Sequence, residues 1–259
     1  MDKIIVVKMG GSAFDSRDTT IEDIVALQQQ GHAIVVVHGG GNLVSQWLEQ
    51  MGIATRFVRG ERVTDRKVLD VVCAVLAGLA NKEIVAGINC AGGRAIGLSG
   101  ADGALIQGRI KSKELGYVAE VTDIDTGLLR TLLEAGYIPV LSPLTLHSRR
   151  AGDDPPLLNS NGDHVAGEIA AALGAGKLVF LTDVDGIRDR AGTLLGQLSA
   201  DEAEALIGSG VASGGMIPKI RACLRALTVD AVTRIINGTQ PHALLREIEG
   251  QGNGTIISK

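Results

Sequence analysis

The fold is decided by the stretch Ala33-Ile34-Val35-Val36-Val37-His38-Gly39-Gly40-Gly41. Its apolar residues follow one another without alternating with polar ones, which predicts a short strand covered on both faces. Three glycines end this strand, and a segment with helical periodicity, Leu43–Met51, follows them. A strand, a glycine turn and a helix in this order form one unit of a mainly parallel sheet.

The same unit recurs along the 259 residues of the chain. The predicted strands are Ile4–Met9, Ala33–His38, Arg94–Leu98, Tyr137–Ser142, Lys177–Asp183 and Thr233–Asn237. The predicted helices are Ile21–Gln30, Leu43–Met51, Arg66–Asn89, Thr126–Glu134, Asp163–Leu173, Ala200–Gly208 and Pro218–Leu227. This alternation predicts an α/β fold, a three-layer sandwich in which helices cover both faces of an open, mainly parallel sheet.

Two segments interrupt the alternation, Leu105–Thr122 and Leu144–Leu158, where polar and basic residues mix with glycine and proline. We expect them to form β-hairpins or excursions that cover a site. No repeat or low-complexity linker divides the chain, so a boundary near Gly174–Gly176 would separate two lobes of one unit. A single domain over residues 1–259 is therefore expected, with one lobe over 1–174 and a second over 175–259.

The composition excludes several classes of protein. Of the residues, 45% are hydrophobic and 21% are charged, a balance that argues against a disordered chain. No uninterrupted apolar stretch approaches the roughly 18 to 20 residues that cross a membrane. A net charge of −4 and an aromatic content of 2% offer nucleic acids neither a positive surface nor stacking platforms. The first apolar run is too short for a signal peptide, so we expect a cytoplasmic protein without membrane or nucleic acid partners.

The three cysteines, Cys73, Cys90 and Cys223, lack the paired spacing of metal ligands. Their odd number prevents all three from pairing within one chain. We expect reduced thiols in the core of the protein.

One predicted helix contains the stretch Val68–Leu79, which is apolar on nearly every side. A helix of this kind must be buried on several sides. The sequence leaves open whether the core of the protein or a second copy of the chain covers it.

Two predicted strands end in glycines, Gly10-Gly11 and Gly39-Gly40-Gly41, but neither turn matches a P-loop or a dinucleotide-binding fingerprint. Each is either a tight turn that only glycine can form, or a place where backbone N–H groups approach an anion. Lys8 lies two residues before Gly10 and is either a solvated residue at the rim or a cation beside these turns. Together they look like the walls of a phosphate site at the carboxyl edge of the sheet.

A second lysine, Lys219, follows another glycine turn, Gly214-Gly215, and the proline that begins a predicted helix. The polar segment Asn159–Asp163 precedes a further apolar helix. Asp163 either caps that helix, as aspartates commonly do, or takes part in the chemistry of the site.

Seven motifs of the chain resemble, in the same order, those of acetylglutamate kinases in the amino-acid kinase family. They are Val7–Ser12 (VKMGGS), Val37–Gly41 (VHGGG), Gly60–Asp65 (GERVTD), Gly97–Gly103 (GLSGADG), Asn159–Asp163 (NSNGD), Leu181–Gly186 (LTDVDG) and Gly214–Lys219 (GGMIPK). The resemblance extends from about Lys3 to Ile257, nearly the whole chain.

The resemblance implies transfer of the γ-phosphoryl group of ATP to the side-chain carboxylate of N-acetyl-L-glutamate, a step of arginine biosynthesis. Because this nucleophile is already ionised, no general base is needed. Catalysis would consist of positioning and of stabilising charge on the transferred group. Mg²⁺ would be held mainly by phosphates and water, so no metal site made of protein ligands is expected.

By the same similarity, Lys8 and Lys219 would hold the phosphoryl group from opposite lobes, and Asp163 would fix both ammonium groups. The backbone N–H groups of Gly11 and Gly40 would donate to the phosphoryl oxygens. Residues implied to bind the amino acid, with Arg62 on its α-carboxylate, are Gly40, Gly41, Arg62, Asn159 and Asn161. Residues implied to bind the nucleotide and its phosphates are Gly10, Gly11, Thr182, Asp183, Gly186, Ser213 and Met216.

Some residues depart from this pattern. Gly162 stands where acetylglutamate kinases usually have alanine, and Thr64–Lys67 and Gly108–Lys111 resemble kinases that act on aminoadipate or glutamate attached to a small acidic carrier protein. A rim that could dock such a carrier consists of Arg56, Arg59, Arg66, Lys67, Arg109, Lys111 and Lys113. Gly214–Lys219 favours the free substrate, acetylglutamate. A non-catalytic protein of the same fold that binds nucleotides or oxyanions is a minor alternative.

About three residues precede the first predicted strand. Arginine-inhibited members of the family carry an additional helix there that joins dimers into a ring. The resemblance therefore implies a homodimer without strong feedback inhibition by arginine. Its two-fold contact would lie along the predicted helix Arg66–Asn89.

Overall fold

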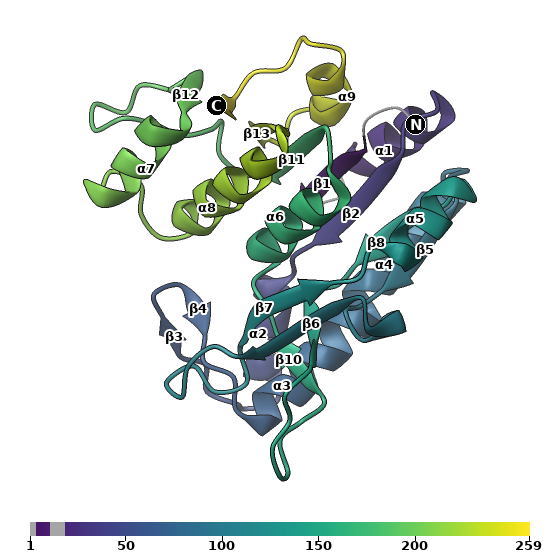
Figure 1. Ribbon diagram of the computed structural model, residues 1–259, viewed down its shortest axis with the longest axis vertical. Coiled ribbons are helices and arrows are strands. Elements are labelled where there is room, and N and C mark those ends of the chain that lie inside the picture. The colour runs from purple at the N-terminus through teal and green to yellow at the C-terminus, as the bar shows by residue number, and fades with distance from the viewer. Residues whose placement is uncertain (1–3, 11–18) are drawn as a thin grey trace.

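The computed structural model describes residues 4–10 and 19–259 (Figure 1). Its centre is an eight-stranded sheet with the order β12-β14-β13-β11-β1-β2-β8-β5. These strands are β1 Ile5–Met9, β2 Ile34–His38, β5 Ala95–Leu98, β8 Ile138–Leu141, β11 Lys177–Thr182, β12 Gln197–Ser199, β13 Val232–Asn237 and β14 Thr255–Ser258. Neighbouring strands are parallel except β13 and β14. The mainly parallel open sheet is confirmed.

All six predicted strands form, and they are six consecutive neighbours in this sheet. The sequence analysis did not identify β12 and β14 at one edge. Both are short, and the glycine-rich segment 250–254 directly precedes β14, so neither shows an extended apolar run.

Helices cover both faces of the sheet. They are α1 Thr20–Gln29, α2 Gly41–Gln50, α3 Arg66–Cys73, α4 Asn81–Cys90, α5 Gly127–Glu134, α6 Gly162–Leu173, α7 Ala200–Gly208, α8 Met216–Ala226 and α9 Ala243–Ile248. Short 3-10 helices lie at Asp102–Ala104 and Leu227–Val229. All seven predicted helices form, whereas α9 was not predicted.

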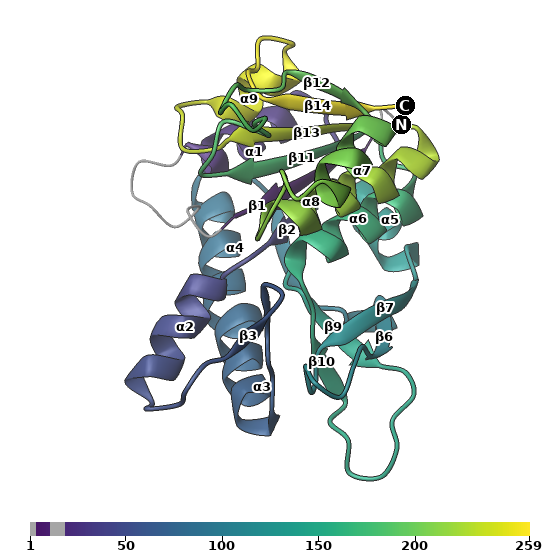
Figure 2. The same cartoon turned by 90° about the vertical axis from the view of Figure 1, so that its left-hand side faces the viewer.

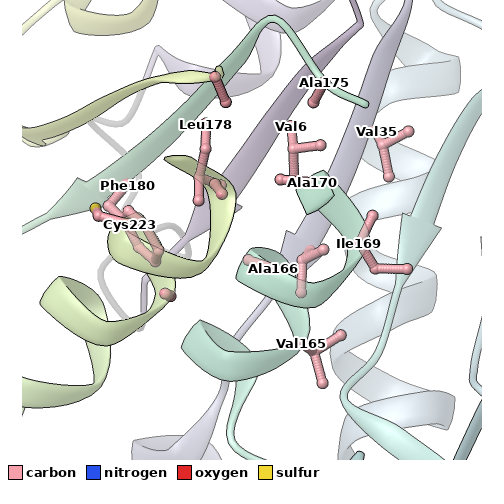
Figure 3. Packing of buried hydrophobic residues seen from close by; sticks show 14 of the residues in the cluster. Val6, Val35, Val165, Ala166, Ile169, Ala170, Ala175, Leu178, Phe180 and Cys223 are labelled. Carbon is pink, nitrogen blue, oxygen red and sulfur yellow. The ribbon is translucent and has the colours of Figure 1, made fainter. Parts of the chain in front are cut away.

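Alternate residues of the strands enter two separate cores. Val6 and Phe180 pack with α5, α6, α7 and α8 on one face, as Figure 3 shows for α6 and α8. Val7 and Val36 pack with α1, α4 and α9 on the other face. Successive side chains of a strand point to opposite faces, so a continuous apolar run supplies both cores at once.

The two segments that interrupt the alternation form one smaller sheet. Its strands are β6 Ile106–Ile110, β7 Ala119–Ile124, β9 Leu144–His147 and β10 Leu157–Asn159, in the order β10-β9-β6-β7. Each segment is an antiparallel hairpin, as expected, and parallel pairing of β6 with β9 joins them. A third hairpin, β3 Phe57–Val58 and β4 Glu61–Arg62, lies near α2 and α3 (Figure 2).

The predicted helix over Arg66–Asn89 is continuous to Cys90, but its middle, η1 (Ala74–Ala80), is π-helical. By length and mean hydropathy, 1.7 in its most apolar window, this helix could cross a membrane, and 44% of that window is buried in the protein. Val68, Val72 and Val75 lie in a core cluster, whereas Ala74 and Gly78 are exposed. The described chain therefore buries one side of this helix rather than all of it.

The prediction that all three cysteines are core thiols is wrong for one of them. Cys223 is buried and Cys73 is partly buried, but Cys90 ends α4 on the solvent side and is exposed. All three thiols are free. Burial raises the pKa of Cys223 to about 12 and that of Cys73 to about 11, which keeps both protonated at neutral pH.

Candidate active site

Three charged side chains meet at the carboxyl edge of the large sheet: Lys8 in β1, Asp163 at the start of α6 and Lys219 in α8. The Lys8 Nζ lies 2.7 Å from Asp163 Oδ1, and the Lys219 Nζ donates a hydrogen bond of 3.1 Å to Asp163 Oδ2. Their side chains are only 9%, 15% and 8% exposed for Lys8, Lys219 and Asp163. Lys8 is therefore not a solvated rim residue, and two ammonium groups share one carboxylate.

Close packing of α6 on α8 brings Lys219 to this carboxylate. A Cβ on Gly167 of α6 would lie 2.8 Å from the backbone of Ala222 in α8, so only glycine fits there. Asp163 and Lys219 lie about one helical turn before these two residues on their helices. The contact between the helices thus fixes the separation of the two charged groups.

The Asp163 carboxylate is held in its ionised form. Burial alone raises its pKa, but the charges of Lys8 and Lys219 outweigh burial and hold the pKa below its usual value. Its buried Oδ1 forms the ion pair with the Lys8 ammonium group.

The alternative in which Asp163 caps α6 is wrong. Asn161 is the cap, because its Oδ1 accepts hydrogen bonds from the backbone N–H groups of Asp163, at 2.8 Å, and His164, at 3.3 Å. Asn161 therefore already uses its side-chain oxygen within the protein. The Asp163 carboxylate is left to the two lysines.

The glycine turn between β2 and α2 lies beside Lys8. Gly40 has a φ of +137°, and a Cβ there would lie 2.7 Å from Leu76, so the position requires glycine. A Cβ on Gly39 would lie 3.6 Å from the Lys8 Nζ. Within the described ranges, no acceptor takes a hydrogen bond from the Gly40 N–H. Both interpretations of this turn therefore agree with the structure. It is a tight turn that requires glycine, and its Gly40 N–H, which donates to no described residue, could approach an anion.

The turn after β1 packs against β11. The Gly10 N–H donates to Leu181 O at 3.1 Å, and a Cβ on Gly10 would lie 2.8 Å from the same oxygen. Gly10 is needed for this close approach, and its own N–H is already used. Gly11, which was expected to donate to phosphoryl oxygens, lies outside the described residues.

Arg62 is a buried cation, 8% exposed, in β4. Its Nη2 donates to Gly41 O at 2.8 Å and to Ser45 Oγ at 2.7 Å, and the guanidinium lies 4.7 Å from the centre of the Phe57 ring. Its Nη1 is buried and has no hydrogen-bond partner among the described residues. Burial lowers the Arg62 pKa. A buried donor without an acceptor is costly, and an anionic group beside it would remove that cost.

Most of these residues line one cavity of about 270 Å³. Asn159 is among them, and its Nδ2 donates to Thr64 Oγ1 at 3.1 Å, which leaves its oxygen without a described donor. Residues that line the cavity are Lys8, Gly39–Asn42, Phe57, Gly60–Arg62, Val118, Pro143 and Asn159–Asp163. The predicted amino-acid site, Gly40, Gly41, Arg62, Asn159 and Asn161, is thus brought together in one place.

Of the residues expected to bind the nucleotide, those that the structure describes do not line this cavity. Thr182 ends β11, where its hydroxyl donates to Asp183 Oδ1 at 3.1 Å. Gly186 has a φ of +147° and packs against Thr255. Ser213 and Met216 form the turn that begins α8, where the Met216 N–H donates to Ser213 O at 3.1 Å. These two segments lie in the half of the molecule that contains α7, α8 and β11–β14 (Figure 1).

The sequence analysis missed residues that hold the site in shape. Ser45 accepts from Arg62, and Thr64 joins Asn159 to the Arg62 carbonyl. Ser45 lies one helical turn after Gly41, and this spacing is the only sequence signal that places it near the glycine turn. Thr64 lies within the motif Gly60–Asp65, but nothing in the sequence distinguishes it from its neighbours.

The sequence pattern of the amino acid kinase family matches residues 3–237. The acetylglutamate kinase of Dehalococcoides mccartyi is 49% identical over 256 residues, which cover 98% of this chain and 94% of that protein. That of Thermosynechococcus vestitus is 49% identical over 265 residues, with coverages of 98% and 88%. A solved structure of N-acetylglutamate synthase from Neisseria gonorrhoeae superposes with a TM-score of 0.85 at 28% identity, over 99% of this chain and 59% of that chain.

Proposed function

Because the chain belongs to the amino acid kinase family, we infer that it is an acetylglutamate kinase, which transfers the γ-phosphoryl group of ATP to the side-chain carboxylate of N-acetyl-L-glutamate. Identity of about half the residues to curated acetylglutamate kinases, over nearly their full length, supports this activity. The product is an acyl phosphate, and the reaction belongs to arginine biosynthesis.

The proposal rests on the Asp163 carboxylate, which pairs with both Lys8 and Lys219. A carboxylate must approach a triphosphate, and the two anions repel one another. Two lysines and the Asp163 carboxylate leave a net charge of +1 at the point where the reactants meet. Fixed cations in a dry site stabilise the charge on the transferred group without reorganising during the reaction.

In this reaction Asp163 acts as a positioning residue that stays ionised. The substrate carboxylate is already deprotonated, so no proton has to move before attack. The low pKa of Asp163 keeps it from protonating the phosphoryl oxygens and keeps both ammonium groups oriented. The lysines would contact the equatorial oxygens, and the Gly40 N–H would add a neutral donor.

Arg62 would bind the α-carboxylate of acetylglutamate. Its Nη2 is anchored to Gly41 and Ser45, which fixes the guanidinium plane, while the unpartnered Nη1 remains for the ligand. The free oxygen of Asn159 would accept from the acetamido N–H of the substrate. We propose the nitrogen of Asn161 as a further donor to the substrate, since its oxygen caps α6.

ATP would enter as its magnesium complex, with the ion as part of the substrate. The described residues contain no group of three or more His, Cys, Asp or Glu side chains placed to hold a metal, and Asp163 is occupied by two lysines. Mg²⁺ commonly takes most of its ligands from phosphates and water.

We propose that the nucleotide lies on the lobe over residues 175–259, along Thr182–Gly186 and Ser213–Met216. Both segments follow the carboxyl ends of parallel strands or begin a helix, which is where open α/β sheets bind phosphates. The lobe over 1–174 would hold the amino acid. Lys219 is the cation that the second lobe contributes to the first.

Ion pairs within the basic rim favour free acetylglutamate over a carrier-bound substrate. Arg66, Arg109 and Lys111 are each paired with an acid of this chain: Asp70, Glu120 and Glu61, respectively. Paired cations attract an acidic protein less strongly than free ones.

We also propose that the protein is a cytoplasmic homodimer, with the exposed side of α3, η1 and α4 at the two-fold contact. Ala74 and Gly78 are exposed there on a helix whose other side is buried. Small residues let two helices approach closely. Size-exclusion chromatography with light scattering should give a dimer, and a monomer or hexamer would contradict this.

The activity is tested by incubating the protein with Mg-ATP, acetylglutamate and hydroxylamine, which converts acyl phosphates into hydroxamates. We expect hydroxamate formation with acetylglutamate and none with carrier-linked aminoadipate or glutamate. Turnover only with the carrier-linked substrates would reassign the substrate. Nucleotide binding without turnover on any acidic amino acid would indicate the non-catalytic alternative.

A further inference from the structure

His38 is a buried titratable side chain beside the reacting centre, and the mechanism above does not use it. We propose that His38 is a positioning residue for phosphoryl transfer. Its Nδ1–H holds the carbonyl oxygen of Gly39 and so directs the N–H of Gly40 into the cavity, while Asn81 fixes the tautomer of the imidazole. The inference rests on the proposed function, since it gives a task to the donor that would contact the phosphoryl group.

The position of His38 is fixed by burial and by two polar contacts. It ends β2, is 0% exposed, and directly precedes the glycine turn. Its Nδ1 lies 2.7 Å from Gly39 O, and its Nε2 lies 3.2 Å from the Nδ2 of Asn81. Burial lowers the pKa of His38 to about 4 and outweighs the hydrogen bond to Gly39 O, which acts in the opposite direction, while the charges of Lys8 and Lys82 lower the pKa further. The imidazole is thus neutral at ordinary pH and carries a single ring proton.

These contacts determine which ring nitrogen carries the proton. A carbonyl oxygen only accepts, so the nitrogen beside Gly39 O must be the donor, Nδ1–H. Nε2 then has a free lone pair and accepts from the amide of Asn81. The two hydrogens of Asn81 Nδ2 are accounted for, because the same nitrogen also donates to Val140 O at 2.9 Å.

The orientation of Asn81 is fixed in turn by its neighbours. Its Oδ1 accepts from the Nζ of Lys82 at 3.1 Å, and Asn81 is only 1% exposed. Gly97 in β5 leaves the room for this amide, because a Cβ there would overlap Asn81 Oδ1. The network therefore runs across the ends of β2, β8 and β5, and each member has one consistent orientation.

The hydrogen bond to Gly39 O orients the peptide group that joins Gly39 to Gly40. In a planar trans peptide the C=O and N–H point in opposite directions, so holding the Gly39 carbonyl toward the imidazole turns the Gly40 N–H away from it. Gly40 lines the cavity, and no described residue accepts from its N–H. A hydrogen bond to the carbonyl also polarises the peptide and strengthens its N–H as a donor.

The helix that contains Asn81 also packs against the glycine turn Gly39–Gly41 through Leu76. Leu76, in the π-helical segment η1, lies where a Cβ on Gly40 would stand, and Asn81 follows that segment directly. π-helical turns change the direction in which the following side chains point and often occur at functional sites. Here η1 sets both the packing on Gly40 and the reach of Asn81 to His38.

The tautomer is tested on the wild-type protein by NMR of the imidazole nitrogens. The chain has five histidines, and the His38 signals are identified by their loss in the His38→Asn variant. We expect a protonated Nδ1 and an unprotonated Nε2 at pH 7. A protonated Nε2 would overturn the assignment whatever the enzyme's substrate.

The positioning role is tested by kinetics with two amide variants. In His38→Asn the amide nitrogen takes about the place of Nδ1 and keeps a donor to Gly39 O, whereas in His38→Gln it takes about the place of Nε2 and loses it. We expect His38→Ala and His38→Gln to lower kcat by about 10- to 100-fold with each KM within about threefold, and His38→Asn to recover most of that loss. Equal kcat values for His38→Asn and His38→Gln, or a wild-type kcat in His38→Ala, would overturn the proposal.

Two further variants act on the network without altering His38. Asn81→Leu removes the donor to Nε2, and Gly97→Ala displaces the Asn81 amide, so both should lower kcat in the same direction. The matched control is His147→Asn, because His147 is also buried and its Nδ1 lies 3.1 Å from Pro155 O, away from the cavity. Its kcat should stay at the wild-type value. If the control lost as much kcat as His38→Ala, then replacing any buried histidine would lower kcat, and the specific role of His38 would be refuted.

Failure of this inference and failure of the proposed function give different results. If the wild-type protein forms no hydroxamate from acetylglutamate, the proposed function is wrong, and the NMR measurement still decides the tautomer. If the wild-type protein is active and the variants of His38 behave alike, the function stands and the positioning role is refuted.

Discussion

The two halves of the proposed active site differ in how deeply their polar groups are buried. At the ends of β1 and β2, Lys8, His38 and Asp163 are buried and bonded to one another or to backbone. At the end of β11 and the start of α8, Asp183 and Ser213 are exposed, as are their glycine neighbours in the α8 turn. The half proposed to bind the amino acid is therefore preorganised, whereas the half proposed to bind the nucleotide contains exposed turns at Asp183 and Ser213 that a ligand can order.

The difference in burial predicts different effects of substitution in the two halves. Replacing one member of a buried group of charges leaves the remaining charge unpaired, so changes to Lys8 or Asp163 should lower kcat, and a change to Arg62 should raise the KM for the amino acid. Exposed turns accommodate change at small cost, so changes in the second half should act mainly on the KM for ATP.

The largest effect is expected for Lys8→Ala, which removes one of the two cations from Asp163. Loss of a preorganised group that stabilises transition-state charge commonly costs about 3 kcal/mol, so kcat should fall by at least about a hundredfold. The hydroxamate assay measures this. Lys177→Ala is the control, because Lys177 begins β11 at the opposite edge of the sheet. A near-normal kcat in Lys8→Ala would remove the role proposed for Lys8.

The second effect concerns how the stability of the protein depends on pH through the buried imidazole of His38. The pKa of His38 is lowered from 6.5 to about 4, so between these pH values the unfolded chain binds more protons than the folded one. Stability is therefore complete above pH 6.5 and is lost as pH falls toward 4, by about 3 kcal/mol from this residue. Urea unfolding at several pH values measures the slope. His38→Asn should show a shallower slope than the wild type, and an unchanged slope would contradict the burial argument.

A somewhat smaller effect is expected for Arg62→Lys. The substitution removes the fork that bonds Gly41 and Ser45 and that would bind the substrate carboxylate. We expect the KM for acetylglutamate to rise by about 10- to 30-fold, or roughly 2 kcal/mol, with the KM for ATP unchanged. Arg109→Lys, which alters an exposed ion pair with Glu120, serves as the control. Equal rises in both KM values would indicate general damage.

The smallest effect is expected in the nucleotide half, for Gly214→Ala. Gly214 has a φ of +53°, which strains an alanine by about 1 kcal/mol, but no atom of the described residues lies within 4 Å of the place that its Cβ would take. The KM for ATP should rise by a few fold, with kcat within about twofold. A hundredfold loss of kcat would show that this half is as preorganised as the other.

The same contrast explains how much the sequence reveals. Strands such as β1 and β2 are continuous apolar runs buried on both faces, so their pattern predicts them closely. The meeting of Lys8, Asp163 and Lys219 follows from the family resemblance together with parallel strand order. The pairing of β6 with β9 depends on contacts between segments far apart in the chain, which no local pattern encodes.

Supporting residues were harder to predict than the charged ones. Asn161 and Asp163 both suit a helix N-terminus, and only the observed hydrogen bonds show which one caps α6. Asn81 lies within a mostly apolar helix, and its contact with His38 depends on the π-helical segment before it. Cys90 was wrongly predicted to lie in the core. Cysteine is usually buried, but Cys90 ends a helix in solvent.

In the proposed mechanism the Asp163 carboxylate orients both lysines for phosphoryl transfer, and the kcat of an Asp163→Asn variant measures that role. This substitution keeps the size of the side chain but removes the charge that both ammonium groups share. We predict a kcat lowered by about 100- to 1,000-fold in protein that remains folded by circular dichroism. A folded Asp163→Asn variant that forms acetylglutamyl phosphate at the wild-type rate would contradict the mechanism.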